Sequence, residues 1–234
     1  MKDVIFTSYC FDNVAAGGDY KAQQDRLKES ILAIYPEAHV HFKYDPEHIG
    51  KPKFQQSLYG FKADLVKECL AKGFKKIIFF DTAICLNEKV DYWFEIIKDY
   101  GVLAPIDRQK LDTVTSNNCL DHLNLNREDV KHINLVGGSI YVFDFNLPIC
   151  QEVFTIWADL EQRGLFGQQE DLSNGKLEGH RMDETCMALS LSFNGVEPLG
   201  HDAIRYAYEH PVTKELTRMG EGNYEPIAIK RHFK

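Results

Sequence analysis

The sequence lacks several patterns that would assign a function directly. The stretch after its first apolar run, TSYCFDNVAAGGDY, contains no G-x-G-x-x-G, which excludes the usual dinucleotide-binding fingerprint of dehydrogenases. A G-x-x-x-x-G-K-[ST] motif is also missing, which excludes a P-loop nucleotide hydrolase. The six cysteines are scattered singly, without a C-x-x-C pair. We therefore expect buried free thiols in a reducing compartment.

Long apolar runs are missing too. No stretch approaches the roughly 18 residues needed to span a bilayer, and the opening MKDVIFTSYC lacks the apolar region and cleavage site of a signal peptide. The chain has 27 basic and 35 acidic residues, a net charge of −8, which argues against a surface that grips nucleic acid throughout. We expect a soluble cytoplasmic protein without a membrane partner. Nothing in the sequence predicts its oligomeric state.

The first hundred residues alternate between strand-like and helix-like segments. The segments 4–6, 39–44 and 76–80 are predicted strands, and 19–36 and 58–71 are predicted helices. The run KIIFF at 76–80 is apolar without alternation, as in a strand covered on both faces, so it should be central in a parallel sheet. This order predicts an α/β sandwich with a mostly parallel central sheet flanked by helices.

The second part of the chain is less regular. We expect residues 104–134 to form loops and one short helix, and 139–145 to form a strand. Pro148 stands at a predicted first helical position. Residues 164–182 hold four glycines and many polar side chains, so we interpret them as a long loop that closes over substrate. A buried helix is predicted from Asp183 to Phe193.

Polar residues follow two predicted strands directly. Thr7, Ser8 and Tyr9 come after the first strand, and Asp81 and Thr82 come after the central one. In open parallel sheets, ligands bind beyond the carboxyl ends of the strands. Asp81 is therefore a candidate ligand contact, and the alternative is a helix cap or turn residue. The following residues, AICL, are not turn formers and lower the weight of that alternative.

An ordered set of segments resembles the GT-A-fold glycosyltransferases. The segments are Phe61-Lys62 on a helix, Ile77 to Ala83 (IIFFDTA), Gly137-Gly138-Ser139 before a strand, Trp157 in the following helix, and Asp183-Glu184 opening a buried helix near Gly195. The resemblance covers roughly residues 4–205. It implies one GT-A-like domain over 1–234, with a nucleotide-binding half at 1–103 and an acceptor and catalytic half at 104–234.

The resemblance implies an enzyme that moves a hexosyl or pentosyl group from a nucleotide-diphosphate donor, a UDP-sugar, to an acceptor hydroxyl. A saccharide, a protein side chain and a hydroxymethylated DNA base all present such hydroxyls, and no motif separates them. The small size without a membrane anchor suits a phage or viral enzyme that modifies DNA. The alternative from another class is a non-catalytic nucleotide-sugar-binding module, which would bind the donor without turnover.

One departure from the family concerns the metal. Most such enzymes carry Asp-x-Asp after the central strand, and its two carboxylates hold a divalent metal against the diphosphate. This chain has Asp81-Thr82-Ala83 instead. The resemblance then implies Mn²⁺ or Mg²⁺ on Asp81 with help from His201, since a hard cation needs several ligands. Lys62 offers another way to neutralise phosphate, unless it is an ordinary solvated helix lysine. Metal use is open at this point.

Asp183 and Glu184 are the predicted catalytic pair, because a carboxylate can take the acceptor proton or stabilise positive charge on the sugar. We expect Asp183 to lie nearer the reacting carbon, with His180 and Arg181 as weaker candidates for the same pocket. The alternative is a pair of carboxylates that only interacts with the helix dipole.

The predicted donor-binding residues share positions at strand ends, helix starts or glycine turns, and they are Thr7, Ser8, Tyr9, Tyr59, Lys62, Asp81, Thr82, Ala83, Gly137, Gly138 and Ser139. Gly137 and Gly138 would let the backbone approach the donor sugar, or they form a plain turn. The two tyrosines are assigned to nucleotide stacking or phosphate contact. The basic tail 230–234 is either a solvated terminus or a segment that closes over phosphates or contacts nucleic acid.

Overall fold

A computed structural model describes residues 1–11, 19–46, 57–167, 181–209, 213–218 and 225–231. The elements of the first part are β1 (Val4–Cys10), α1 (Tyr20–Ile34), β2 (His39–Tyr44), α3 (Phe61–Ala71), β3 (Lys76–Phe80), β4 (Ile84–Leu86), α4 (Tyr92–Ile96) and β5 (Val102–Leu103). Those of the second part are β6 (Ile106–Lys110), α5 (Leu111–Val114), α6 (Asn117–His122), α7 (Arg127–Val130), β7 (Asn134–Val136), β8 (Ile140–Asp144), α8 (Pro148–Gln162), α9 (Met182–Phe193), α10 (His201–Ile204), β9 (Tyr206–Glu209), β10 (Leu216–Arg218) and β11 (Ala228–Arg231).

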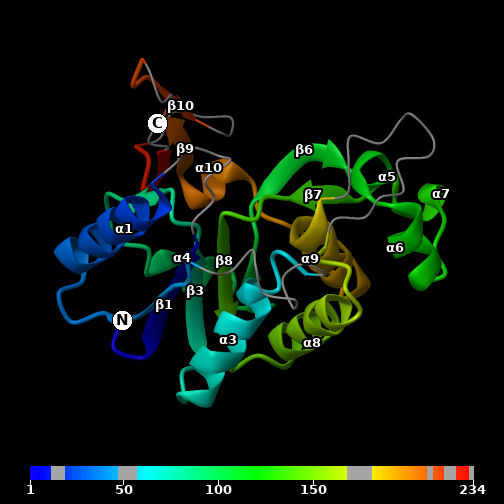
Figure 1. Cartoon of the computed structure of the whole chain (residues 1–234), viewed down its shortest axis with the longest axis horizontal. Helices are drawn as coiled ribbons and strands as arrows, with labels where there is room; N and C mark the ends of the chain where they lie inside the picture. Colours follow the sequence, from blue (N-terminus) through cyan, green and yellow to red (C-terminus); the bar gives the residue numbers. More distant parts are fainter. Residues whose placement is uncertain (12–18, 47–56, 168–180, 210–212, 219–224, 232–234) are drawn as a thin grey trace.

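The main sheet has five strands in the order β2-β1-β3-β8-β5. Strands β2, β1 and β3 are parallel, while β8 runs antiparallel to both β3 and β5. The sheet is therefore mostly parallel, with β8 as the exception, and helices flank it (Figure 1). This confirms the predicted fold class. The central position of β3 is confirmed too, and it explains why its apolar residues do not alternate with polar ones.

Each face of the sheet packs against its own helices. Successive strand residues point to opposite faces, so Ile77 and Phe79 join α3, α8 and α9 in one apolar core. Ile78 and Phe80 join α1 and α4 in the other. Figure 1 shows α1 on one side of the strands and α3 with α8 on the other. The candidate site lies on the α3 side.

A second, four-stranded sheet has the order β10-β9-β11-β4. Strand β11 lies between two partners, parallel to β9 and antiparallel to β4. Lys230 is paired with Ile84 in this register, only three residues after Asp81. The pairing therefore carries a residue from near the end of the chain to the carboxyl end of β3.

Several predicted boundaries are wrong. The first strand does not end at Phe6 but continues to Cys10, so Thr7 and Ser8 lie inside it rather than in a turn. The predicted helix at 58–71 begins at Phe61. Residues 104–134 contain the strand β6, the first residue of β7, and three short helices rather than one. The loop predicted at 164–182 falls mostly on residues 168–180, which lie outside the described residues.

Other predictions agree with the structure. The helix predicted over 19–36 is α1, and Asp19 caps it, because its side chain accepts a hydrogen bond from the Ala22 amide at 2.8 Å. Pro148 stands in the first turn of α8. All six cysteines are buried free thiols. In the portion of the chain that the structure describes, no helix has both the length and the apolar character needed to cross a membrane.

Candidate active site

A cavity of about 260 Å³ opens at the carboxyl end of β3. Segments far apart in the sequence line it, and their residues are Tyr59, Lys62, Asp81, Gly138, Ser139, Arg181, Met182, Asp183, Glu184 and Lys230. The structure thus brings both predicted catalytic carboxylates together with Asp81, Lys62, Tyr59, Gly138 and Ser139. These residues come from the start of α3, the end of β3, the turn before β8, the start of α9 and β11.

A buried ion pair forms the floor of this cavity. The Lys62 ammonium lies 2.6 Å from Asp183 Oδ2, and each side chain is only 4% exposed. Lys62 also donates to the Gly138 carbonyl at 3.0 Å. The Tyr141 hydroxyl donates to the same Asp183 oxygen at 3.1 Å. Lys62 is therefore not the solvated helix lysine that the sequence allowed, and it holds Asp183 in one position.

Burial and neighbouring charges act in opposite directions on this pair. Burial raises the pKa of Asp183 to about 6, although Lys62 lowers it. Burial lowers the pKa of Lys62, but Asp183, Asp81 and Glu184 outweigh that effect, so the pKa is raised. Burial also raises the pKa of Tyr141 well above its ordinary value. Tyr141 and Lys62 therefore stay protonated near neutral pH, and both serve as donors to Asp183.

Glu184 is held differently. Its Oε1 accepts a hydrogen bond from the Gly138 amide at 2.9 Å, and its Oε2 lies 2.9 Å from Arg181 Nε. The Glu184 side chain is 19% exposed, against 4% for Asp183. The two carboxylates that open α9 therefore differ in environment, since Asp183 is enclosed and Glu184 faces the cavity opening.

Gly138 is required by the closeness of these groups. A Cβ at this position would lie 2.7 Å from Lys62 Nζ and 3.0 Å from Glu184 Cγ, whereas a Cβ on Gly137 would meet nothing closer than 3.9 Å. Close packing therefore requires a glycine at position 138 and not at 137, and the predicted approach of the donor sugar to this backbone stays a prediction. The structure places Gly137 against Pro105, whose carbonyl accepts the Gly137 amide at 2.7 Å.

This difference gives a matched pair of variants. Gly138→Ala should lower the free energy of unfolding by about 1–3 kcal/mol, because Lys62 and Glu184 must move from their hydrogen bonds. Gly137→Ala should stay within about 0.5 kcal/mol of the wild type. Urea unfolding followed by circular dichroism measures both. Equal stability of the two variants would contradict the packing described around Gly138.

Asp81 lies where the sequence placed it. Its backbone amide donates to the Ser139 carbonyl at 2.9 Å, which ties the end of β3 to the start of β8. Lys230 Nζ donates to the Ser139 hydroxyl at 3.1 Å, so a cation from β11 shares the cavity with Asp81. This arrangement puts the Asp81 carboxylate and the Lys230 ammonium in one cavity at the carboxyl end of β3.

Several predicted donor-binding residues do not reach this cavity. Thr7 and Ser8 are 0% exposed inside β1, and Thr7 Oγ1 donates to the His41 carbonyl at 2.8 Å. Thr82 and Ala83 are buried and do not line the cavity. The Thr7 hydroxyl is satisfied by the neighbouring strand β2, so its polarity alone did not mark a site.

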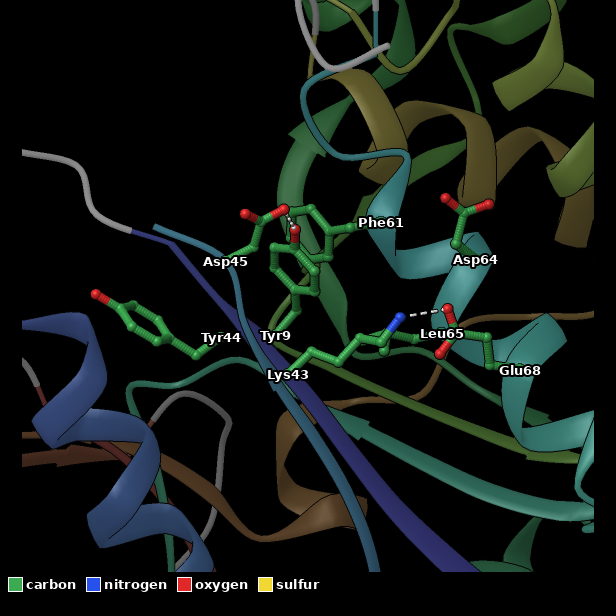
Figure 2. A pocket seen from close by; sticks show the side chains of 8 residues that line it. All are labelled: Tyr9, Lys43, Tyr44, Asp45, Phe61, Asp64, Leu65 and Glu68. Atoms are coloured by element: carbon green, nitrogen blue, oxygen red, sulfur yellow. Dashed lines mark hydrogen bonds and ion pairs between the residues drawn. The ribbon is translucent and has the colours of Figure 1, made fainter. Parts of the chain in front are cut away.

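Tyr9 lines a separate hollow of about 410 Å³. Its ring stacks on Phe61 with the centroids 4.5 Å apart, and its hydroxyl donates to Asp45 Oδ2 at 2.9 Å. Figure 2 shows these three side chains together, with Lys43 and Glu68 forming an ion pair beside them. Tyr59 and Phe61, two residues apart, line the cavity and this hollow respectively. The two spaces therefore flank the start of α3.

The cavity residues do not fit the predicted divalent cation. Ala83 stands where a second carboxylate would be, and its side chain is buried. His201 packs on Tyr206, with ring centroids 5.5 Å apart, and does not line the cavity with Asp81. Within the described ranges, no group of three or more His, Cys, Asp or Glu residues could hold a metal ion. The predicted pair of Asp81 and His201 is thus not brought together.

Sequence reasoning missed two residues of the site. Tyr141 was assigned only to a strand, although its hydroxyl contacts Asp183. Lys230 was treated as part of a basic tail. The signal available for Tyr141 was its hydroxyl near the start of a mostly apolar strand that follows Ser139, whereas no local pattern marks Lys230 as a cavity residue.

Known structures share this architecture. No protein-family model matches the sequence, and no curated protein matches it. The bifunctional glycosyltransferase WbbM is similar over 97% of this chain, with a TM-score of 0.57 and 12% identity, and this chain spans 45% of the WbbM chain. An active-site mutant of LgtC is similar over 98% of this chain and 86% of its own, with a TM-score of 0.50 and 8% identity. The chain therefore has the fold of GT-A-type glycosyltransferases.

Proposed function

We propose that this protein is a glycosyltransferase that moves a sugar from a nucleotide-diphosphate donor to an acceptor hydroxyl. The observation that carries the proposal is the enclosed Asp183 carboxylate, fixed by Lys62 and Tyr141 beside the open Glu184, in a cavity at the carboxyl end of the central strand. Ligands of open α/β sheets bind at this place. The fold shared with WbbM supports the same interpretation.

The donor extends across the two spaces that flank the start of α3. The aromatic wall of Tyr9 and Phe61, with the Asp45 carboxylate, suits a nucleobase and its ribose, and we propose uridine. The diphosphate then lies near Asp81 and Ser139, and the sugar reaches Asp183 and Glu184. Tyr59 lines the cavity just before the start of α3.

Transfer needs one proton acceptor and one leaving group. The acceptor oxygen forms a bond to the anomeric carbon while the bond from that carbon to the diphosphate oxygen breaks. The bonding electron pair leaves with the diphosphate, and the hydroxyl proton passes to a carboxylate. We assign Asp183 as the carboxylate that takes this proton, because Lys62 and Tyr141 hold the Asp183 side chain in place. Glu184 positions the Gly138 backbone against the sugar.

A panel of nucleotide sugars tests the function. The protein should hydrolyse one donor slowly in the absence of an acceptor and transfer its sugar when an acceptor is present. We propose a UDP-hexose or UDP-pentose as donor, and either a glycan or hydroxymethylated DNA as acceptor. Mass spectrometry of the products identifies both. Tight donor binding without any turnover would instead indicate a nucleotide-sugar-binding module.

Asp81→Asn should weaken donor binding without unfolding the protein. Asp81 follows the last strand residue and supports little of the core, but its carboxylate lines the cavity that the donor would occupy. We expect donor affinity to fall by about tenfold, because the carboxylate would accept a charged hydrogen bond from a hydroxyl of the donor and an amide would accept it more weakly. Isothermal titration calorimetry measures the affinity, and the melting temperature serves as the control. Unchanged affinity would remove Asp81 from the site.

A further inference from the structure

The three cations of the cavity differ in whether a carboxylate neutralises them. Lys62 is bound to Asp183, and Arg181 is bound to Glu184, so both cations are already neutralised by carboxylates. Lys230 differs from them. Its ammonium donates to the neutral hydroxyl of Ser139, and within the part of the chain that the structure describes it forms no ion pair. It is thus the cavity cation whose charge is left for a ligand.

The position of Lys230 is fixed by the sheet and not by a flexible tail. Strand β11 is hydrogen-bonded on both sides, with Lys230 opposite Ile84 of β4 and Tyr208 of β9. The preceding residues Ala228 and Ile229 are buried at 0% and 1% exposure. This anchoring holds the ammonium beside Ser139 before any ligand arrives. A charge that is placed in advance stabilises an anion without the cost of reorganisation.

The donor of the proposed reaction needs such a charge. Its diphosphate is an anion, and the Asp81 carboxylate in the same cavity would repel it unless a cation lay between them. The GT-A fold implies a divalent metal for this task, but the described residues around Asp81 do not form a cation site. An ammonium group has three donors, and Ser139 takes one of them. Two remain for phosphate oxygens.

We propose that Lys230 replaces the divalent cation and binds the diphosphate of the donor directly. This inference rests on the proposed glycosyltransferase function. When the bond from the anomeric carbon to the diphosphate oxygen breaks, the electron pair stays on the diphosphate, and Lys230 stabilises the charge that develops there. The chain then needs no metal to release its leaving group, and the missing second carboxylate of the Asp-x-Asp pattern is explained.

Calorimetric titration of the full chain with UDP and with uridine tests the inference, each with and without EDTA. UDP should bind equally well with and without the chelator. Lys230→Gln should weaken UDP binding by about 10- to 100-fold, the range for a hydrogen bond between charged groups, and Lys230→Arg should recover part of it. Uridine binding should not change, because uridine has no phosphate. The melting temperature of each variant shows whether β11 remains in place.

Lys76→Gln is the matched control. Lys76 begins β3, at the end of the strand opposite Asp81, and its ammonium faces Asp3 at the surface. This variant should bind UDP like the wild type. Loss of UDP binding on adding EDTA, restored by Mn²⁺, would overturn the Lys230 inference and leave the proposed function standing. Equal weakening of UDP and uridine by Lys230→Gln would also overturn it. No binding of any nucleoside diphosphate from a panel of UDP, GDP, ADP and CDP would overturn both.

Discussion

Replacing Asp183 by asparagine is expected to lower the turnover of sugar transfer by about 10²–10⁴-fold, which is the usual contribution of a general base. The carboxylate that accepts the proton would be lost, while the side chain keeps its shape. Donor affinity should change far less, because the diphosphate and the nucleoside contact other residues in the proposed arrangement. Steady-state kinetics and donor titration on the same preparation separate the two effects.

Glu184→Gln is the matched control for this variant. Its amide oxygen can still accept the Gly138 amide, and only the partly exposed contact with Arg181 is weakened. We expect a smaller loss of transfer than for Asp183→Asn. Rates are compared per folded molecule, since the Asp183 variant leaves Lys62 without its partner. Near-normal transfer by Asp183→Asn, or a larger loss from Glu184→Gln, would move the proton acceptor to Glu184.

The pH profile provides a second check on Asp183. Burial raises its pKa from an ordinary value of 3.8 to about 6, so transfer should fall about tenfold per pH unit below about pH 6. Protonation of Asp183 has the opposite effect on stability, which it increases. Between about pH 4 and pH 6 the folded protein binds the Asp183 proton more tightly than the unfolded chain does. The contribution of this group to the free energy of unfolding therefore decreases as pH rises through that range.

Replacing Lys62 by methionine is expected to lower the free energy of unfolding by about 3–5 kcal/mol, the cost of leaving a buried charge without its partner. Methionine has a similar length and removes only the charge and its hydrogen bonds. Asp183 would then remain buried with Tyr141 as its donor. Denaturant unfolding measures the loss. Transfer should fall as well, because the pKa of Asp183 would rise without Lys62 and a smaller fraction of the carboxylate would be ionised.

Two further variants show whether the loss of stability in Lys62→Met comes from the broken ion pair. The double variant Lys62→Met with Asp183→Asn should lose less stability than the sum of the single variants, because it leaves no buried charge. Lys76→Met should cost no more than about 1 kcal/mol, since the 3.4 Å pair of Lys76 with Asp3 lies at the surface. Additive losses in the double variant would show that Lys62 and Asp183 do not act as an ion pair.

The sequence predicted the fold class from local patterns. The unbroken apolar run of β3 indicated a strand covered on both faces, and the two cores confirm this. It also predicted that Asp81 lies at the end of that strand and that Asp183 and Glu184 open a buried helix. These features depend on the spacing of residues within a few positions of one another, so they can be recognised along the chain.

Polarity was misleading where a polar side chain has a distant partner. Thr7 and Ser8 suggested a turn, but they lie within β1, and the Thr7 hydroxyl donates to a carbonyl of β2 34 residues away. His201 stands late in the chain, where the resemblance implies a metal ligand, but its ring packs on Tyr206 outside the cavity. The carbonyl that satisfies Thr7 is remote in sequence, and whether His201 meets Asp81 depends on how two distant segments of the chain pack.

The sequence by itself thus determined the layers of the fold and the carboxylates that line the candidate site at the carboxyl end of β3. Only the tertiary structure decided that Lys62 meets Asp183 across 121 positions and that Lys230 reaches Ser139 across 91. The physical reason lies in the range of the interactions. Helix and strand patterns arise from contacts between near neighbours, whereas an ion pair or a hydrogen bond between distant segments exists only after the whole core has packed.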